Sequence, residues 1–193
     1  MASTTTTTLI TCPAAPDGDC GAVFAKALLT VDERRAGKEK LVAKWKAGPQ
    51  LVAADFGDPS SGTTAYAMCV YGDSGALVGE YKIDRAGASC RGNPCWKVLG
   101  GTAAAKGYRY NDRDLTAYGI RSVSLKAREA GRSSVVVKGR GGTGLPLGVA
   151  TALAESTAGA TIQLFGTDLP ECFSVTASLL TKTGVSSFKA EAP

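Results

Sequence analysis

The sequence contains no histidine, and this absence excludes several classes of active site at once. Ser-His-Asp and Cys-His catalysis need an imidazole base. HExxH zinc sites and histidine-braced copper need imidazole ligands. The sequence also lacks a run of about 20 apolar residues, the length that a transmembrane helix requires. It therefore predicts neither a histidine-dependent enzyme nor a membrane span.

Aromatic residues are few, at 7% of the chain, whereas glycine is plentiful, with 24 residues among 193. This composition favours many short strands and turns over long helices. The length suits one domain of ordinary size. We expect residues 1–11 to be a flexible, Thr-rich lead-in and residues 12–193 to form a single β domain stapled by disulfides.

Alternation is clearest in residues 40–46, where Lys40, Lys44 and Lys46 fall on one face of an expected strand and Leu41, Ala43 and Trp45 on the other. Successive side chains of a strand point to opposite faces, so Trp45 is predicted to face the core. Turn residues at 72–75 and 129–132 separate further strand-like runs and predict two hairpins. Strands at this short spacing are typical of an all-β fold, either an antiparallel β-sandwich or a Greek-key barrel.

The formal net charge is +5, from 22 basic and 17 acidic residues, and the basic residues are distributed along the sequence. The densest group, Lys38–Lys46, alternates with apolar residues as the solvated face of a strand does. Nucleic-acid binders usually carry a basic stripe with aromatic residues between the charges. We therefore expect no nucleic-acid partner.

The six cysteines predict three disulfides and an oxidising compartment, and hence a secreted, extracellular or cell-surface protein. Their spacing favours two local bridges and one long one, which is one of several pairings that six cysteines allow. The expected pairs are Cys12–Cys20, Cys90–Cys95 and Cys69–Cys172. The first residues lack the charged and apolar regions of a signal peptide, so for a secreted protein we expect that peptide to have been removed.

The segment Cys90–Lys97 combines two cysteines, an Asn-Pro turn and one of the two tryptophans. Its spacing does not match a paired zinc-ligand motif, and no histidine is present to complete a metal or redox site. We expect a disulfide staple at a corner of the β domain, with the indole of Trp96 packed beside it.

Gly139–Gly144 matches the GxGxxG pattern of dinucleotide-binding sites. In those sites the glycine loop leads directly into a helix of a βαβ unit. Here the segment Leu145–Gly148, which includes a proline, interrupts the place where that helix must begin, and the rest of the chain does not follow a βαβ pattern. No nucleotide cofactor is expected.

Three aspartates in turn-rich segments, Asp55, Asp58 and Asp73, are candidates for a calcium site. Calcium binds six to eight oxygen ligands, and carboxylates in loops commonly supply them. The alternative is that each carboxylate bonds the backbone of its own turn, as aspartates in turns usually do. Apart from calcium, no cofactor is expected.

Tyr108 and Tyr110 flank Arg109 and are candidates for carbohydrate contact. Aromatic side chains on an exposed surface can stack against sugar rings, because they combine an apolar face with a polar edge. The alternative is a role in the core or in cross-strand packing, which is usual for tyrosines on strands.

A combination of short motifs resembles a six-cysteine, β-rich domain of uncharacterised, predicted secreted bacterial proteins. The resemblance extends from Cys12 to Lys189 and implies secretion, a β-rich fold and the six-cysteine framework. No established activity comes with it, and so it implies no catalytic residue. The motifs that carry it lie at 44–48, 55–59, 66–71, 94–97, 106–110, 137–141 and 171–173.

The sequence favours a secreted or surface-displayed β-sandwich module for binding or structural display, with an extracellular polymer or a protein as partner. It points to no catalytic residue. One alternative is an extracellular, histidine-free hydrolase that uses carboxylates such as Asp55 and Asp58, with or without calcium. Another is a subunit that self-associates through exposed strand edges into fibres or a surface layer.

Overall fold

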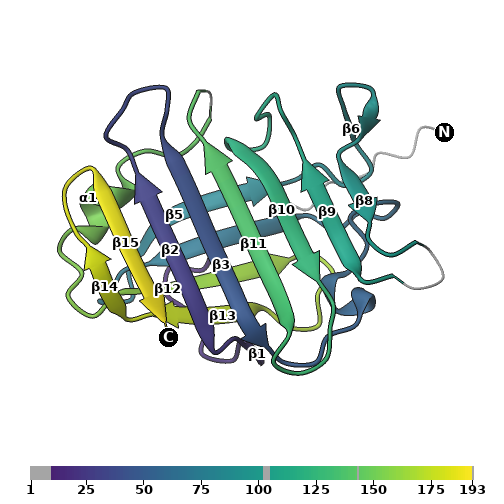
Figure 1. The fold of residues 1–193 in the computed structure, drawn as a ribbon, viewed down its shortest axis with the longest axis horizontal. Coiled ribbons are helices and arrows are strands. Elements are labelled where there is room, and N and C mark those ends of the chain that lie inside the picture. The colour runs from purple at the N-terminus through teal and green to yellow at the C-terminus, as the bar shows by residue number, and fades with distance from the viewer. Residues whose placement is uncertain (1–9, 102–104, 143, 193) are drawn as a thin grey trace.

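The computed structural model of the chain describes residues 10–101, 105–142 and 144–192. It contains a five-stranded sheet, an eight-stranded sheet and a small two-stranded ribbon. The strands of the small sheet run across those of the large sheet, which lies in front of them in Figure 1. No helix in these ranges is long and apolar enough to cross a bilayer. The predicted all-β, antiparallel sandwich with disulfide staples is confirmed.

The small sheet has the order β1, β13, β12, β4, β5, and all of its pairings are antiparallel except the one between β1 and β13. The large sheet has the order β14, β15, β2, β3, β11, β10, β9, β8. The strands of the small sheet are β1 (Ala22–Val23), β4 (Tyr66–Tyr71), β5 (Leu77–Ile83), β12 (Ala160–Gly166) and β13 (Phe173–Ala177). Those of the large sheet are β2 (Lys26–Asp32), β3 (Lys40–Gly48), β8 (Trp96–Val98), β9 (Gly107–Asn111), β10 (Ile120–Lys126), β11 (Ser133–Arg140), β14 (Leu179–Lys182) and β15 (Ser187–Ala192). The remaining elements are β6 (Ser89–Cys90) and β7 (Asn93–Pro94), which form the ribbon, the 3₁₀ helix η1 (Ala53–Phe56) and the helix α1 (Val149–Leu153).

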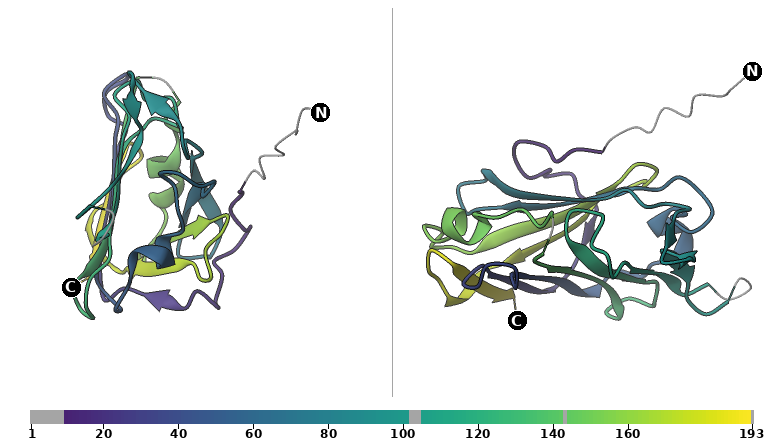
Figure 2. Two further views of the ribbon diagram at one scale, coloured as in Figure 1. Left: turned by 90° about the vertical axis from the view of Figure 1, so that its right-hand side faces the viewer. Right: turned by 90° about the horizontal axis from the view of Figure 1, so that it is seen from above.

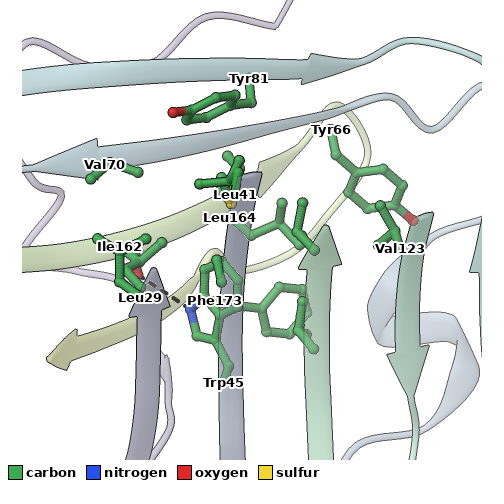
Figure 3. Close-up of a cluster of buried hydrophobic side chains, with 14 of the residues drawn as sticks. Leu29, Leu41, Trp45, Tyr66, Val70, Tyr81, Val123, Ile162, Leu164 and Phe173 are labelled. Atoms are coloured by element: carbon green, nitrogen blue, oxygen red, sulfur yellow. Dashed lines mark hydrogen bonds between the residues drawn. The ribbon is translucent and has the colours of Figure 1, made fainter. Parts of the chain in front are cut away.

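The core lies between the two sheets, and Trp45 on β3 is at its centre. Its side chain is fully buried, as the alternation in β3 predicts. The indole Nε1 donates a hydrogen bond of 3.2 Å to the carbonyl oxygen of Ile162 on β12, so one side chain links the two sheets (Figure 3). This hydrogen bond stabilises the buried indole N–H, which would cost free energy if it were left unpaired.

Both predicted hairpins are present, as β4–β5 and β10–β11. Two strands near the C-terminus, β14 and β15, were not predicted. In β15 the inward positions are Phe188 and Ala190, and the outward ones include Lys189 and Glu191. A single large apolar residue beside alanine, which has low strand propensity, gives too weak a pattern to predict a strand from the sequence.

The N-terminal segment 10–20 covers the outer side of the small sheet, opposite the core (Figure 2). The side chain of Gln163 on β12, which is buried, exchanges two hydrogen bonds with the backbone of Asp17, at 2.9 and 2.7 Å. The hydroxyl of Tyr71 on β4 donates to the carbonyl of Pro13 at 3.1 Å. Because of this cover, every residue of β4 is buried.

The disulfides follow from this path of the chain. Cys90–Cys95 is confirmed, but the other two predicted pairs are wrong, because the bridges are Cys12–Cys69 and Cys20–Cys172. Residues 12–20 do not fold back on themselves into a local loop. They run across the sheet, so the first cysteine meets β4 and the second meets the start of β13. Residues 1–9 of the expected lead-in lie outside the described ranges.

Candidate anion-binding face

The outer side of the large sheet carries lysine and arginine at many of its solvent-facing positions. On β3, the inward residues are buried, and Lys40 and Lys46 point outward and are exposed, with Lys44 half-buried between them. The same alternation on β11 turns Lys138 and Arg140 outward. Strand pleating therefore sorts basic residues that are distant in the sequence onto one side of the sheet.

Strand pairing arranges these side chains in rows across the sheet. One row contains Lys26, Lys46, Ser134 and Lys126, each opposite the next in the register of β2, β3, β11 and β10. On β8 and β9, Lys97 and Arg109 face each other directly. We call the following set the basic face: Lys26, Lys40, Lys44, Lys46, Lys97, Arg109, Lys126, Lys138 and Arg140.

The positive charge of the basic face is not neutralised by the carboxylates on the same side. Asp32 and Glu191 also point outward there, but each is paired at 2.6 Å with a nearby cation outside this set, Arg34 and Lys189. None of the four ion pairs between described residues includes a member of the basic face. Like charges held together in this way repel one another, and an anionic ligand would relieve that repulsion.

A cavity of about 480 Å³ lies at the β8 end of the basic face. One wall is the β6–β7 ribbon, which the Cys90–Cys95 disulfide closes, and the other walls come from β8, β9 and the loop after β9. Among the described residues, four basic side chains and two asparagines line it, and no carboxylate does. The lining residues are Cys90, Arg91, Asn93, Pro94, Cys95, Lys97, Arg109, Asn111 and Arg113.

Buried Asp112 fixes the loop that carries Arg113. Its carboxylate accepts hydrogen bonds from the backbone N–H groups of Asp114 at 2.9 Å and Thr116 at 2.8 Å, and from the Tyr110 hydroxyl at 3.2 Å. Burial raises the pKa of Asp112, but a hydrogen bond from the Thr116 hydroxyl at 2.5 Å, together with these other hydrogen bonds, outweighs burial and holds the pKa below the ordinary value. The loop conformation therefore favours the ionised carboxylate.

Asp114, from the same loop, holds a second cation of the cavity. Its carboxylate accepts a 2.8 Å hydrogen bond from Nε of Arg91, and a second from Nη2 of the same guanidinium. This contact lowers the pKa of Asp114 and raises that of Arg91. Arg91 is thereby positioned at the rim, and Arg109 and Arg113 have no carboxylate partner among the described residues.

The predicted exposed pair of tyrosines is wrong. Tyr110 is fully buried and Tyr108 is 8% exposed. Residues two apart on a strand share a face, and on β9 that face is the inner one, where Tyr110 packs against Trp96 with ring centroids 5.1 Å apart. Arg109, between them, is the residue that points outward. Trp96 is 2% exposed beside the Cys90–Cys95 staple, as predicted.

The three candidate calcium ligands each bond the backbone of their own or a neighbouring turn. Asp55 accepts from the N–H of Val52 at 2.7 Å. Asp58 accepts from Ser60 and Ser61, and hydrogen bonds from Ser61 lower its pKa.

Asp73 accepts from the N–H groups of Ala158 and Thr157, which lower its pKa. Across the residues that the structure describes, no group of three or more His, Cys, Asp or Glu side chains is arranged to hold a metal ion. The calcium site, and the hydrolase that would use Asp55 and Asp58, stay predictions.

Comparison of the chain with protein-family models, curated proteins and solved structures finds no match. The resemblance to a six-cysteine secreted domain therefore stays a prediction, and the function must be argued from the site itself.

The basic face was not predicted from the sequence. Its signal is present, because lysine or arginine occupies alternate positions in several strands. The strands that bring these positions together are neighbours in the order β2, β3, β11, β10, β9, β8, which is not the order of the sequence. The clustering becomes visible only once that order is known.

Proposed function

We propose that this domain is a secreted or surface-displayed binding module, and that its basic face holds an anionic extracellular polysaccharide. The proposal depends on the basic face itself, a sheet surface that the described part of the chain leaves uncovered. No described carboxylate forms an ion pair with its cations. Rows of lysines across a sheet suit a repeating polyanion, since each ammonium is a point charge that tolerates different ligand geometries.

The chemistry of the face favours an acidic polysaccharide over other polymers. Among the described residues, exposed aromatic side chains are limited to Tyr118, in the loop before β10. Single-stranded nucleic acid is usually held by aromatic stacking, and neutral sugars likewise need an apolar ring face. Insertion into a membrane needs exposed apolar side chains, and the half-buried Val42 and Val136 are flanked by lysines and serines.

Three disulfides further favour an oxidising, extracellular setting, where acidic polysaccharides are available as partners. The hydroxyl side chains between the cations, Ser122, Ser124 and Ser134, add hydrogen-bonding groups that suit a hydroxylated polymer.

The test is retention of the purified protein on immobilised heparin and polygalacturonate, with dextran as the neutral control. We expect retention on at least one acidic polymer, none on dextran, and elution by salt, because screening weakens exposed charge pairs. Duplex DNA and phosphatidylserine vesicles are run in competition. Binding that DNA or vesicles displace more effectively than soluble heparin or polygalacturonate would overturn the choice of polysaccharide.

A matched pair of triple variants tests whether the acidic polymer binds at the basic face. Lys44→Gln, Lys46→Gln and Lys138→Gln together remove three charges from the basic face. Lys106→Gln, Arg128→Gln and Arg132→Gln remove the same charge from exposed turns at one end of the sheet. We expect the first variant to elute at clearly lower salt than the second. Equal shifts would mean that only net charge matters, and the proposal would fail.

A further inference from the structure

We infer that the cavity at the β8 end of the basic face is a subsite for one anionic sugar residue, which binds through its carboxylate or sulfate group. The inference rests on the proposed function and deepens it, since the subsite would give the module selectivity that a flat charged surface lacks. Its volume, about 480 Å³, lies within the range of pockets that hold small ligands.

The cavity provides directed donors, whereas the rest of the face provides mostly lysines. Arg109 and Arg113 contribute two guanidinium groups that have no carboxylate partner among the described residues, with Lys97 and the amides of two asparagines beside them. Arg91 adds positive charge at the rim, where Asp114 already accepts hydrogen bonds from its Nε and Nη2. A guanidinium presents parallel N–H groups that match the two oxygens of a carboxylate or sulfate. Because none of the described residues that line the cavity is a carboxylate, and the nearby carboxylate of Asp114 is paired with Arg91, an anion entering it meets mainly donors.

The donors stand on well-fixed parts of the fold. Arg109 lies on β9, whose inner side packs through Tyr110 onto Trp96. The ribbon that forms the outer wall is closed by the Cys90–Cys95 disulfide, and the hydrogen bonds of Asp112 fix the loop of Arg113. Binding groups held in place before the ligand arrives lose less conformational entropy when it binds.

A second cationic cavity, at the β2–β3 turn, provides a comparison. It measures about 310 Å³ and is lined by Arg34, Lys40, Arg140 and other cations, but also by Asp32. That carboxylate already accepts two hydrogen bonds from the Arg34 guanidinium, at 2.9 and 2.6 Å. In both cavities one arginine is paired with an aspartate, but only here is the aspartate itself a lining residue, so an anion entering this cavity would face a carboxylate. For that reason we propose no subsite at the β2–β3 turn.

The place of the subsite suggests that it takes the end of a polymer chain. The row formed by Lys44, Val136, Ser124, Arg109 and Lys97 leads across the sheet and ends at the cavity. From β2 to β8 the face spans five strand intervals, or about 24 Å at the usual strand spacing. A polyanion lying along this row would bring its last residue to the ribbon wall.

The test is a calorimetric titration of the protein with trigalacturonate and with a heparin-derived tetrasaccharide, and maltotriose is the neutral control. The subsite variant is Arg109→Gln with Arg113→Gln. The control is Arg128→Gln with Arg132→Gln, which removes the same charge from exposed turns outside the basic face. We expect at least one of the acidic oligosaccharides to bind the wild-type protein. The subsite variant should lower that affinity about tenfold or more, and the control variant should change it by less than about twofold. Unchanged urea midpoints establish that both variants fold.

The outcomes separate this inference from the proposed function. If the wild-type protein is retained on acidic polymers but binds neither oligosaccharide, the subsite is wrong and the basic face stands. If the subsite variant and the control weaken oligosaccharide binding equally, the effect is one of net charge and the subsite is wrong, whereas polymer retention still decides on the basic face. If an oligosaccharide binds and only the subsite variant loses it, while no acidic polymer is retained, the subsite stands and the proposed polymer-binding role fails. Equal affinity for maltotriose would overturn the requirement for an anion.

Discussion

The outer sides of the two sheets differ in composition and in exposure to solvent. The outer side of the small sheet is apolar at Ala67, Cys69 and Tyr71, and the chain covers it with its own N-terminal segment. The outer side of the large sheet carries the basic face, and within the described ranges no segment covers it (Figure 2). A sheet side that is apolar has to be covered, whereas one that is charged can remain in water.

The difference is visible in the strands themselves. All six residues of β4 are buried, and they read as the continuous apolar run of a strand with both sides covered. β3 alternates between buried and solvent-facing residues, as expected of a strand with one side in water. The covered side thus serves stability, and the uncovered side is available for a ligand.

The largest expected effect comes from removing the covalent attachment of the cover. The Cys12–Cys69 bridge spans 57 residues, and a loop of that length contributes about 4 kcal/mol in the chain-entropy description. We expect the variant Cys12→Ala with Cys69→Ala to lose a free energy of unfolding of that order, measured by urea denaturation. The basic face is remote from this bridge. Retention on an acidic polymer below the unfolding transition should therefore remain, and its loss would show that the two sides are not independent.

A smaller effect on stability is expected at the ribbon. The Cys90–Cys95 bridge spans 5 residues, so its removal as Cys90→Ala with Cys95→Ala should cost about 2 kcal/mol. Here the binding of trigalacturonate or the heparin tetrasaccharide should fall, because the outer wall of the cavity loses its closure. Retention on long polymers should change little. A ribbon variant that binds the oligosaccharide normally would show that the staple does not shape the cavity.

The fold could be predicted to the level of its class and of several strands. The alternation around Trp45 and the turn residues between β4 and β5 are local signals, and local patterns determine pleating and hairpins. The two wrong disulfides and the strands β14 and β15 depend on where distant segments meet. The first cysteine pairs with β4 because residues 10–20 cross a sheet, and no spacing in the sequence encodes that path.

The candidate site could be predicted less well than the fold. The sequence pointed to Tyr108 and Tyr110, and the residue between them, Arg109, is the one that reaches the surface. Alternation with a period of two places both tyrosines on the same side of the strand. Whether that side faces the core or the solvent depends on which other parts of the chain pack against it. The cavity likewise needs the pairing of β8 with β9, and the ribbon folded beside it.

The smallest expected effect is a pH-dependent loss of stability that arises at the cavity loop and not at the N-terminal cover. In the cover, residues 10–20 are tied by two disulfides, whereas the loop at the cavity depends on the ionised carboxylate of Asp112. The pKa of Asp112 is lowered in the folded protein, so its contribution is complete above the unfolded pKa of about 4 and is lost as the pH falls through the folded pKa. We expect Asp112→Asn to lose about 1.5 kcal/mol at pH 7, the low end of the range for hydrogen bonds to a charged group, because the Oδ1 of asparagine can still accept. Its stability deficit relative to the wild-type protein should shrink as the pH falls below about 4. Urea denaturation of both proteins at pH 7, 4 and 3 measures this deficit. A constant deficit across this range would mean that the ionised carboxylate does not hold the loop.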